Sequence, residues 1–273
     1  MMETPAASPL PPPTSGPHAP TSTIDGKAVP AGQGARWWGS AWELFTAAAG
    51  TWLVITILYI AIMMVLSFIP LLGQVAASLL HPVFVGGIVL GCRDQDRGGE
   101  LSVQHLFAGF SEKLGPLVIV ALFYFAGWIM IGLVTLALAI AALGGSVIAA
   151  MLSGDAMQAG IAAFATMGLS LLLVVLVGAL FAIPLLMAFW FAPALVVLRG
   201  DEPWAAMKTS FRACLRNILP FLVYGLLGLL FVILACIPAF LGLLVLIPVG
   251  IATVYTSYKD IFGVPAEVTA AKS

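Results

Sequence analysis

Three polar side chains that could bind a ligand or accept a proton lie within one of the most apolar parts of this sequence. Gln74, Ser78 and His81 are spaced at i, i+4 and i+7, so a helix would place them on one face. A polar residue at membrane depth faces the interior of a helix bundle and hydrogen-bonds there. This intramembrane polar face could contact a substrate, or it could simply link neighbouring helices. The linking role is favoured, because no apolar segment of the chain contains a carboxylate that would complete a proton relay.

A second set of residues with chemical potential is basic. Lys208, Arg212 and Arg216 recur every four residues and would form a stripe along one side of a helix. Such a stripe can bind the phosphates of anionic lipid headgroups, and each residue contributes about 1 kcal/mol near the surface. The alternative is an ordinary basic anchor at the cytoplasmic surface, and this anchor is favoured over a specific headgroup site.

The motifs of common enzyme classes are missing from the sequence. It contains no HExxH, no G-x-S-x-G and no phosphate-binding P-loop. His18, His81 and His105 are far apart and lack cysteine or carboxylate partners at ligand spacing, so no metal site is expected. The sequence therefore predicts a protein that is not an enzyme, with no catalytic residues and no cofactor.

The composition requires lipid as the solvent of this chain. Of its 273 residues, 62% are hydrophobic and 8% are charged, whereas a soluble domain carries about 25% charged residues. The net charge of −1 argues against nucleic-acid binding, which needs a basic surface. We expect an integral membrane protein whose partners are membrane lipids. A second copy of the chain or another membrane protein remains open as a further partner.

Six apolar segments are long enough to cross a bilayer as helices. About 20 residues suffice for the ~30 Å of hydrocarbon, and none of the six contains Asp, Glu, Lys or Arg. Barrel strands are excluded, because they alternate in polarity and these segments are continuously apolar. The sequence therefore predicts an all-α polytopic membrane protein with spans at residues 47–69, 71–92, 116–143, 167–198, 218–237 and 241–258.

The basic residues predict the orientation of the chain. All eleven Lys and Arg residues lie outside the six segments, in connections that can be placed on one side of the membrane. Cytoplasmic loops carry such an excess, and an even number of spans puts both termini on that side. Residues 1–35 are rich in Pro, Ala and Ser and predict a disordered cytoplasmic tail. Residues 36–262 form the membrane domain, and residues 263–273 form a short cytoplasmic tail.

The chain is similar to three copies of one unit, in which an amphipathic stretch is followed by two spans. Pro82 and Pro248 each precede an aspartate by twelve residues, which aligns the first copy with the third. The repeat predicts three helical hairpins that point the same way around a pseudo-threefold axis, each preceded by a short in-plane helix. The aromatic residues expected at headgroup depth are Trp37, Trp38, Trp42 and Trp204.

Several short runs of residues resemble a known family. They are GARWW (34–38), HLFAGF (105–110), APALVVL (192–198), FRACLRN (211–217) and SYKDIF (257–262). Together they look like a family of uncharacterised six-helix bacterial inner-membrane proteins, over residues 34–262. The resemblance implies a location in the bacterial cytoplasmic (inner) membrane and assigns no activity. More loosely, the pattern is similar to the membrane regions of some glycerophosphodiester phosphodiesterases, without their hydrolase domain.

Two classes of function follow from these observations. The first is a non-enzymatic, lipid-associated membrane protein with a scaffold or envelope-homeostasis role. The second is a transporter or channel subunit for an apolar or lipid-like solute. A water-accessible cavity that reaches His81 would favour the second class, and a closed, dry bundle would favour the first.

Overall fold

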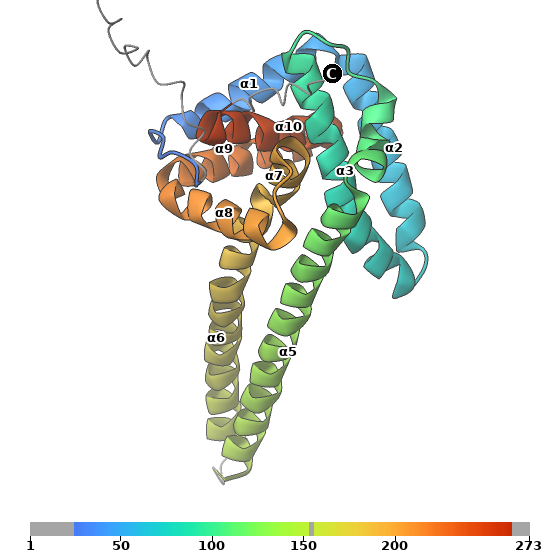
Figure 1. Ribbon diagram of the computed structural model, residues 1–273. Coiled ribbons are helices and arrows are strands. Elements are labelled where there is room, and N and C mark those ends of the chain that lie inside the picture. Colours follow the sequence, from blue (N-terminus) through green and yellow to red (C-terminus); the bar gives the residue numbers. More distant parts are fainter. Residues whose placement is uncertain (1–24, 153–155, 264–273) are drawn as a thin grey trace, which may run out of the picture.

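The computed structural model describes residues 25–152 and 156–263, and within them every regular element is a helix. Figure 1 shows a compact body from which two long helices, α5 and α6, extend side by side. In chain order the elements are α1 (Gln33–Ala47), α2 (Ala49–Ser67), α3 (Leu72–Asp96), the 3₁₀ helix η1 (Val103–Phe107), α4 (Ala108–Glu112), α5 (Leu114–Leu152), α6 (Ala156–Trp190), α7 (Ala192–Arg199), α8 (Pro203–Arg216), α9 (Ile218–Cys236) and α10 (Leu243–Phe262).

Five stretches of the described helices are long and apolar enough to cross a membrane. They are Ala49–Ser67, Leu72–Asp96, Leu114–Ala142, Met167–Arg199 and Ile218–Cys236, and each overlaps one of the predicted spans. The sixth predicted span corresponds to α10, which is not among the five. The second half of α10 carries hydroxyl-bearing and charged residues, which lower its hydropathy. The six-span count therefore stays a prediction.

The α5–α6 pair is longer than a bilayer requires. The 39 residues of α5 correspond to about 58 Å of helix at 1.5 Å per residue, whereas the hydrocarbon layer is ~30 Å thick. A helix of this length must tilt or extend beyond the bilayer. Leu117, Val120 and Ala121 near its start are fully buried against the body, whereas Leu133 and Ile140 farther along are more than half exposed. The far part of the pair is therefore free to face lipid.

The short helices pack on the long helices in a cyclic order, in which each repeat unit contacts the next one. η1 and α4 pack on α3, α8 packs on α6 and α7, and α1 packs on α10. In each case a short element contacts the second long helix of another repeat unit. α3, α7 and α10 also contact one another, and at their meeting point Phe84, Leu195 and Tyr258 are at most 2% exposed. These contacts agree with a pseudo-threefold relationship between the units.

The hairpins differ from the expectation in their direction. In Figure 1, α1, α9 and α10 run across the direction of α5 and α6 instead of alongside it. α1 packs lengthwise on both α9 and α10, and Trp37 and Trp38 on α1 fill the space between them. The prediction of three hairpins that point the same way is therefore not met, because packing against α1 sets the direction of α9 and α10.

The fourth predicted span is broken between α6 and α7, and Ser210 on α8 makes the backbone hydrogen bonds that are lost at this break. The break lies at Phe191, two residues before Pro193, whose ring lacks an N–H and clashes with the preceding turn. Ser210 Oγ on α8 accepts a hydrogen bond from the Phe191 N–H at 2.9 Å and donates one to the Met187 carbonyl at 2.6 Å. Ser210 is fully buried, so it replaces a helical hydrogen bond that water cannot replace.

The N-terminal segment packs on the body from a position closer to the N-terminus than the sequence predicted. The Lys27 N–H donates to the Ile261 carbonyl at 2.9 Å, and the Val29 N–H donates to Asn217 Oδ1 at 2.8 Å. Asn217 is 1% exposed and donates in turn to the Lys27 carbonyl at 3.0 Å. The predicted tail, residues 1–35, therefore ends too late: residues 25–35 are packed, and residues 1–24 lie outside the described part. The partner Asn217 is about 190 residues away, so no local pattern could indicate this docking.

Replacing Ser210 by alanine should destabilise the protein. The substitution leaves the Phe191 N–H and the Met187 carbonyl without their buried partner, which costs about 1–3 kcal/mol. Thermal unfolding of the purified protein in detergent would show a lowered midpoint. The control is Ser111→Ala, because Ser111 is exposed and bonds only within its own helix. Equal midpoints for the two variants would contradict this account of the break.

Candidate functional site: an apolar cavity at His81

The three residues of the predicted polar face lie on α3 but do not form one network. His81 Nδ1 and the Tyr59 hydroxyl on α2 are 2.8 Å apart, so His81 links two helices. The Ser78 hydroxyl donates to the Gln74 carbonyl of its own helix at 2.8 Å. The Gln74 side chain lies near the start of α3 and is exposed. Of the three, His81 is therefore the residue that bonds to another helix, and Ser78 lines a small hollow together with it.

An open cavity of about 620 Å³ reaches His81 between α3, α5, α6, α9 and α10. We call it the His81 cavity. No charged side chain lines it, and its volume falls within the range of ligand pockets, roughly 300–1,000 Å³. Its walls include Val85, Tyr124, Phe189, Trp190, Tyr224 and Ile251. These side chains suit an apolar molecule or the apolar part of a larger one.

A smaller hollow lies on the other side of the same histidine. It measures about 360 Å³ and is lined by Tyr59 and Trp128 together with His81 and Tyr124. His81 and Tyr124 line both hollows and therefore form their common wall. The Phe189 ring stacks on both, with centroids 6.1 Å from His81 and 4.1 Å from Tyr124. Phe189 lines the His81 cavity alone, so His81 and Tyr124 are the residues that the two hollows share.

One residue in the wall of the His81 cavity has a buried hydrogen-bond donor without a partner. Trp190 Nε1 is buried and has no partner within the part of the chain that the structure describes. The Tyr224 hydroxyl, by contrast, is 2.9 Å from Thr253 Oγ1, which donates to the Gly250 carbonyl. A buried, unpaired donor costs about 1–3 kcal/mol.

The basic stripe on α8 is partly occupied by the protein itself. Arg216 donates to the Gly26 carbonyl at 2.6 Å, and Arg212 is 3.4 Å from the Asp25 carboxylate. Lys208 lies 5.7 Å above the Trp204 ring. Two of the three residues thus hold the N-terminal segment, which a helical spacing pattern could not indicate. Binding of lipid headgroups by this stripe stays a prediction.

The aromatic residues predicted at headgroup depth divide into two pairs. Trp42 and Trp204 expose about half of their surface, at 50% and 57%. Trp37 and Trp38 are 2% and 8% exposed, so these two rings pack inside the protein, and their depth in the membrane stays a prediction. Both indole N–H groups donate within the protein, Trp37 to the Asp260 carboxylate at 3.0 Å and Trp38 to the Tyr224 carbonyl at 3.1 Å. These hydrogen bonds to α9 and α10 hold the two rings inside the protein.

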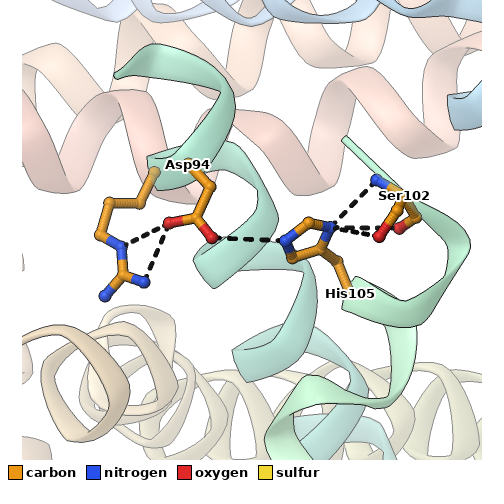
Figure 2. A network of polar contacts seen from close by, with 4 residues as sticks. Asp94, Ser102 and His105 are labelled. Atoms are coloured by element: carbon orange, nitrogen blue, oxygen red, sulfur yellow. Dashed lines mark hydrogen bonds and ion pairs between the residues drawn. The ribbon is translucent and has the colours of Figure 1, made fainter. Parts of the chain in front are cut away.

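His105 has a carboxylate partner that the sequence spacing did not reveal (Figure 2). Its Nε2 lies 3.4 Å from Asp94 Oδ2, and Asp94 also accepts from Arg93 at 2.9 Å. The Ser102 N–H donates to His105 Nδ1 at 3.0 Å, and the Ser102 hydroxyl is 3.1 Å from the same atom.

Serine, histidine and aspartate are the residue types of a hydrolase triad. In this arrangement, however, the Ser102 backbone N–H occupies His105 Nδ1, and the two residues form the capping box of η1. The group therefore fastens the loop after α3 and provides no free base beside the serine.

The comparison with known proteins agrees with an apolar, helical protein. A probable inner membrane protein of Burkholderia thailandensis is 30% identical to this chain over 225 residues, which are 76% of this chain and 82% of the relative. The chain belongs to the family of that inner membrane protein. No family model matches the chain, and no solved structure matches it.

Membership of this family and the five apolar helices show that the protein is embedded in a membrane. Most of the residues that line the His81 cavity belong to these five candidate membrane spans. His81, Tyr124 and Phe189 all lie within such stretches. The cavity therefore lies largely among helices that are apolar and long enough to cross a membrane.

Removal of the His105 ring should loosen the loop after α3. We expect His105→Ala to cost roughly 1 kcal/mol of stability, the usual value of a lost cap. Hydrogen exchange of the amides at residues 102–107 would rise. His105→Gln is the matched variant, because glutamine at this position can restore the capping box. If alanine and glutamine gave the same exchange rates, the capping role would be contradicted.

Proposed function

We propose that this protein is a non-enzymatic, lipid-associated protein of the bacterial inner membrane that holds an apolar, lipid-like molecule in the His81 cavity. The cavity carries the proposal: about 620 Å³ of apolar-lined space among helices that suit a bilayer. A hollow open to lipid is filled by lipid, because an empty one forfeits dispersion contacts along its whole lining.

The lining supports binding more than catalysis. It consists of aliphatic and aromatic side chains with few polar groups, and Trp190 Nε1 is the buried donor without a partner in the described chain. Predominantly apolar and aromatic walls are typical of sites that bind a ligand. A general base would need a reacting group within hydrogen-bond reach, and His81 Nδ1 is already bonded to Tyr59.

Transport of an apolar or lipid-like solute, as a transporter or channel subunit, is the second candidate function. The observation that favours it is the pair of hollows that share His81 and Tyr124 as a wall. Rotation of these rings would join the hollows into one path. Binding and transport differ in one measurable respect, because only transport moves a solute across a sealed vesicle.

The proposed topology has six spans with both termini in the cytoplasm, with α10 as the sixth. Its support is the placement of basic residues around the ends of α3, α7 and α10. Lys259 is 2.7 Å from Asp96 at the end of α3, and Lys27 is 4.0 Å from Asp260. Residues from three connections that the positive-inside rule places in the cytoplasm are thus neighbours in space.

Reporter fusions after Asp260 test this topology. With six spans, a periplasm-dependent reporter such as alkaline phosphatase should be inactive there, and a fluorescent protein should be active. With five spans the results would reverse, because an odd number of crossings puts Asp260 outside. A fusion between residues 153 and 155 is the control, since the scheme places that connection in the periplasm. Phosphatase activity after Asp260 would overturn the cytoplasmic C-terminus.

Filling the His81 cavity should displace its occupant. Gly250 lines the cavity, and a Cβ atom there would meet nothing within 4 Å. Gly250→Leu should therefore lower lipid retention about tenfold, or roughly 1.4 kcal/mol, in native mass spectrometry of the gently extracted protein. Gly132→Leu is the matched control, because Gly132 is exposed on α5 and its Cβ would also meet nothing.

Equal retention in the two leucine variants would contradict binding in the cavity. The same pair, reconstituted in vesicles with a fluorescent lipid, separates the two candidate functions. A binding protein gives no transbilayer movement with any of the chains. A transporter gives movement that Gly250→Leu abolishes and Gly132→Leu retains.

A further inference from the structure

Two polar atoms lie in the wall that the His81 cavity shares with the smaller hollow, one on His81 and one on Tyr124. The His81 ring bonds through Nδ1, which lies 2.8 Å from the Tyr59 hydroxyl. Within residues 25–152 and 156–263, neither His81 Nε2 nor the Tyr124 hydroxyl has a hydrogen-bond partner. Neither atom is fully occluded by its neighbours, in contrast to Trp190 Nε1. Both atoms are therefore open to a bound molecule.

Stacking holds the two rings in place before anything binds. The Phe189 ring is inclined by 25° to Tyr124 and by 21° to His81, so it stacks on both. The edge of the Trp128 ring meets Tyr124 with centroids 6.1 Å apart. Because packing fixes the positions of these rings, a ligand that bonds to them loses little free energy in ordering the site.

The surroundings of the two atoms exclude both a charged ligand and a pure hydrocarbon. His81 lies in the candidate span Leu72–Asp96, and Tyr124 lies in the candidate span Leu114–Ala142. Among the described residues, no charged side chain lines either hollow. An ionised group would be buried there without a counter-ion, which is costly at membrane depth. A hydrocarbon would leave both polar atoms unpaired in an apolar medium, which is also unfavourable.

We infer that the His81 cavity binds a neutral long-chain lipid whose polar end carries hydroxyl groups, bonded at His81 Nε2 and at the Tyr124 hydroxyl. This inference rests on the proposed lipid-holding function and names the chemical class of its ligand. A hydroxyl group both donates and accepts, so it matches His81 in either tautomer. A carbonyl group only accepts, so it matches His81 only when Nε2 carries the proton. The chain of the lipid lies along the apolar walls, which include Val85 and Ile251.

Native mass spectrometry of the full chain, purified in detergent, tests the polar end with three oleoyl probes. Monooleoylglycerol is neutral and carries hydroxyl groups, methyl oleate is neutral and carries none, and oleate is charged. All three share one acyl chain, so differences in their retention report the polar end. We expect monooleoylglycerol to be retained about tenfold better than either other probe, which is the effect of roughly two hydrogen bonds.

Tyr124→Phe is the sharpest variant, because it removes a hydroxyl group that bonds to nothing in the described chain and keeps the ring that stacks on Phe189. It should lower the preference for monooleoylglycerol over methyl oleate several-fold. His81→Asn should do the same, because the shorter amide takes the place of Nδ1 beside Tyr59 and leaves no group at the position of Nε2.

Thr135→Val is the matched control, because it removes a hydroxyl group from the same helix as Tyr124 but outside both hollows. It should keep the full preference for monooleoylglycerol. All chains are compared in one detergent, so that partition of each probe into micelles is the same for every variant. Each variant is first shown to have the elution volume and helical content of the wild-type chain, so that misfolding is recognised as such.

The outcomes distinguish this inference from the proposed function. An unchanged preference in both Tyr124→Phe and His81→Asn would overturn the hydroxyl site, and stronger retention of oleate than of monooleoylglycerol would overturn the neutral assignment. Equal retention of monooleoylglycerol and methyl oleate, with both lowered by Gly250→Leu, would overturn the inference and leave the proposed function standing. Retention of every probe at the wild-type level in Gly250→Leu would overturn both.

Discussion

The close packing of α3, α7 and α10 is the constraint on which the rest of the structure depends. In a membrane, apolar side chains gain little by leaving lipid, so helices associate through tight van der Waals contact and internal hydrogen bonds. Residues 82–92 and 191–197 are buried without interruption. The neighbouring contact of α3 with η1 and α4 leaves no room for larger residues at its glycines. A Cβ atom at Gly87 would lie 2.4 Å from the His105 carbonyl oxygen, and one at Gly109 would lie 2.1 Å from that of Val83.

Buried polar groups hold this centre in one arrangement. Ser210 completes the backbone where the chain breaks before Pro193, and Asn217 fixes the N-terminal segment through the Lys27 carbonyl and the Val29 N–H. Each is a polar side chain at most 1% exposed and fully used in hydrogen bonds. Because such groups are costly when unpaired, they select one packing of the helices over near alternatives.

The hollows follow from the way the helices leave this centre. α5 and α6 extend away from the body together, whereas α9 and α10 cross their direction and pack on α1 (Figure 1). Helices that diverge cannot fill the space between them with side chains of ordinary length. The His81 cavity lies between the diverging pairs, and a second apolar hollow lies where α1 bridges α9 and α10. In the proposed function, a lipid-like molecule fills the His81 cavity.

The sequence by itself determined the solvent, the helical class and the approximate bounds of five apolar helices. It could do so because composition and continuous apolar runs are local properties that survive any arrangement of the chain. It also placed His81 on an apolar helix, although its partner Tyr59 lies 22 residues away on another. The twelve-residue spacing from Pro82 and Pro248 to an aspartate indicated related units, and this repeat stays a prediction.

Only the tertiary structure decided the direction of the hairpins, the burial of Trp37 and Trp38, the docking of residues 25–35 and the partner of His105. Each depends on contacts between residues far apart in the sequence, such as Trp37 with Asp260 and Lys27 with Asn217. An amphipathic pattern shows that a helix has an apolar face, but lipid and another helix satisfy that face equally well. The choice between them rests on complementary shape and on hydrogen-bond partners, which arise only when the chain is folded.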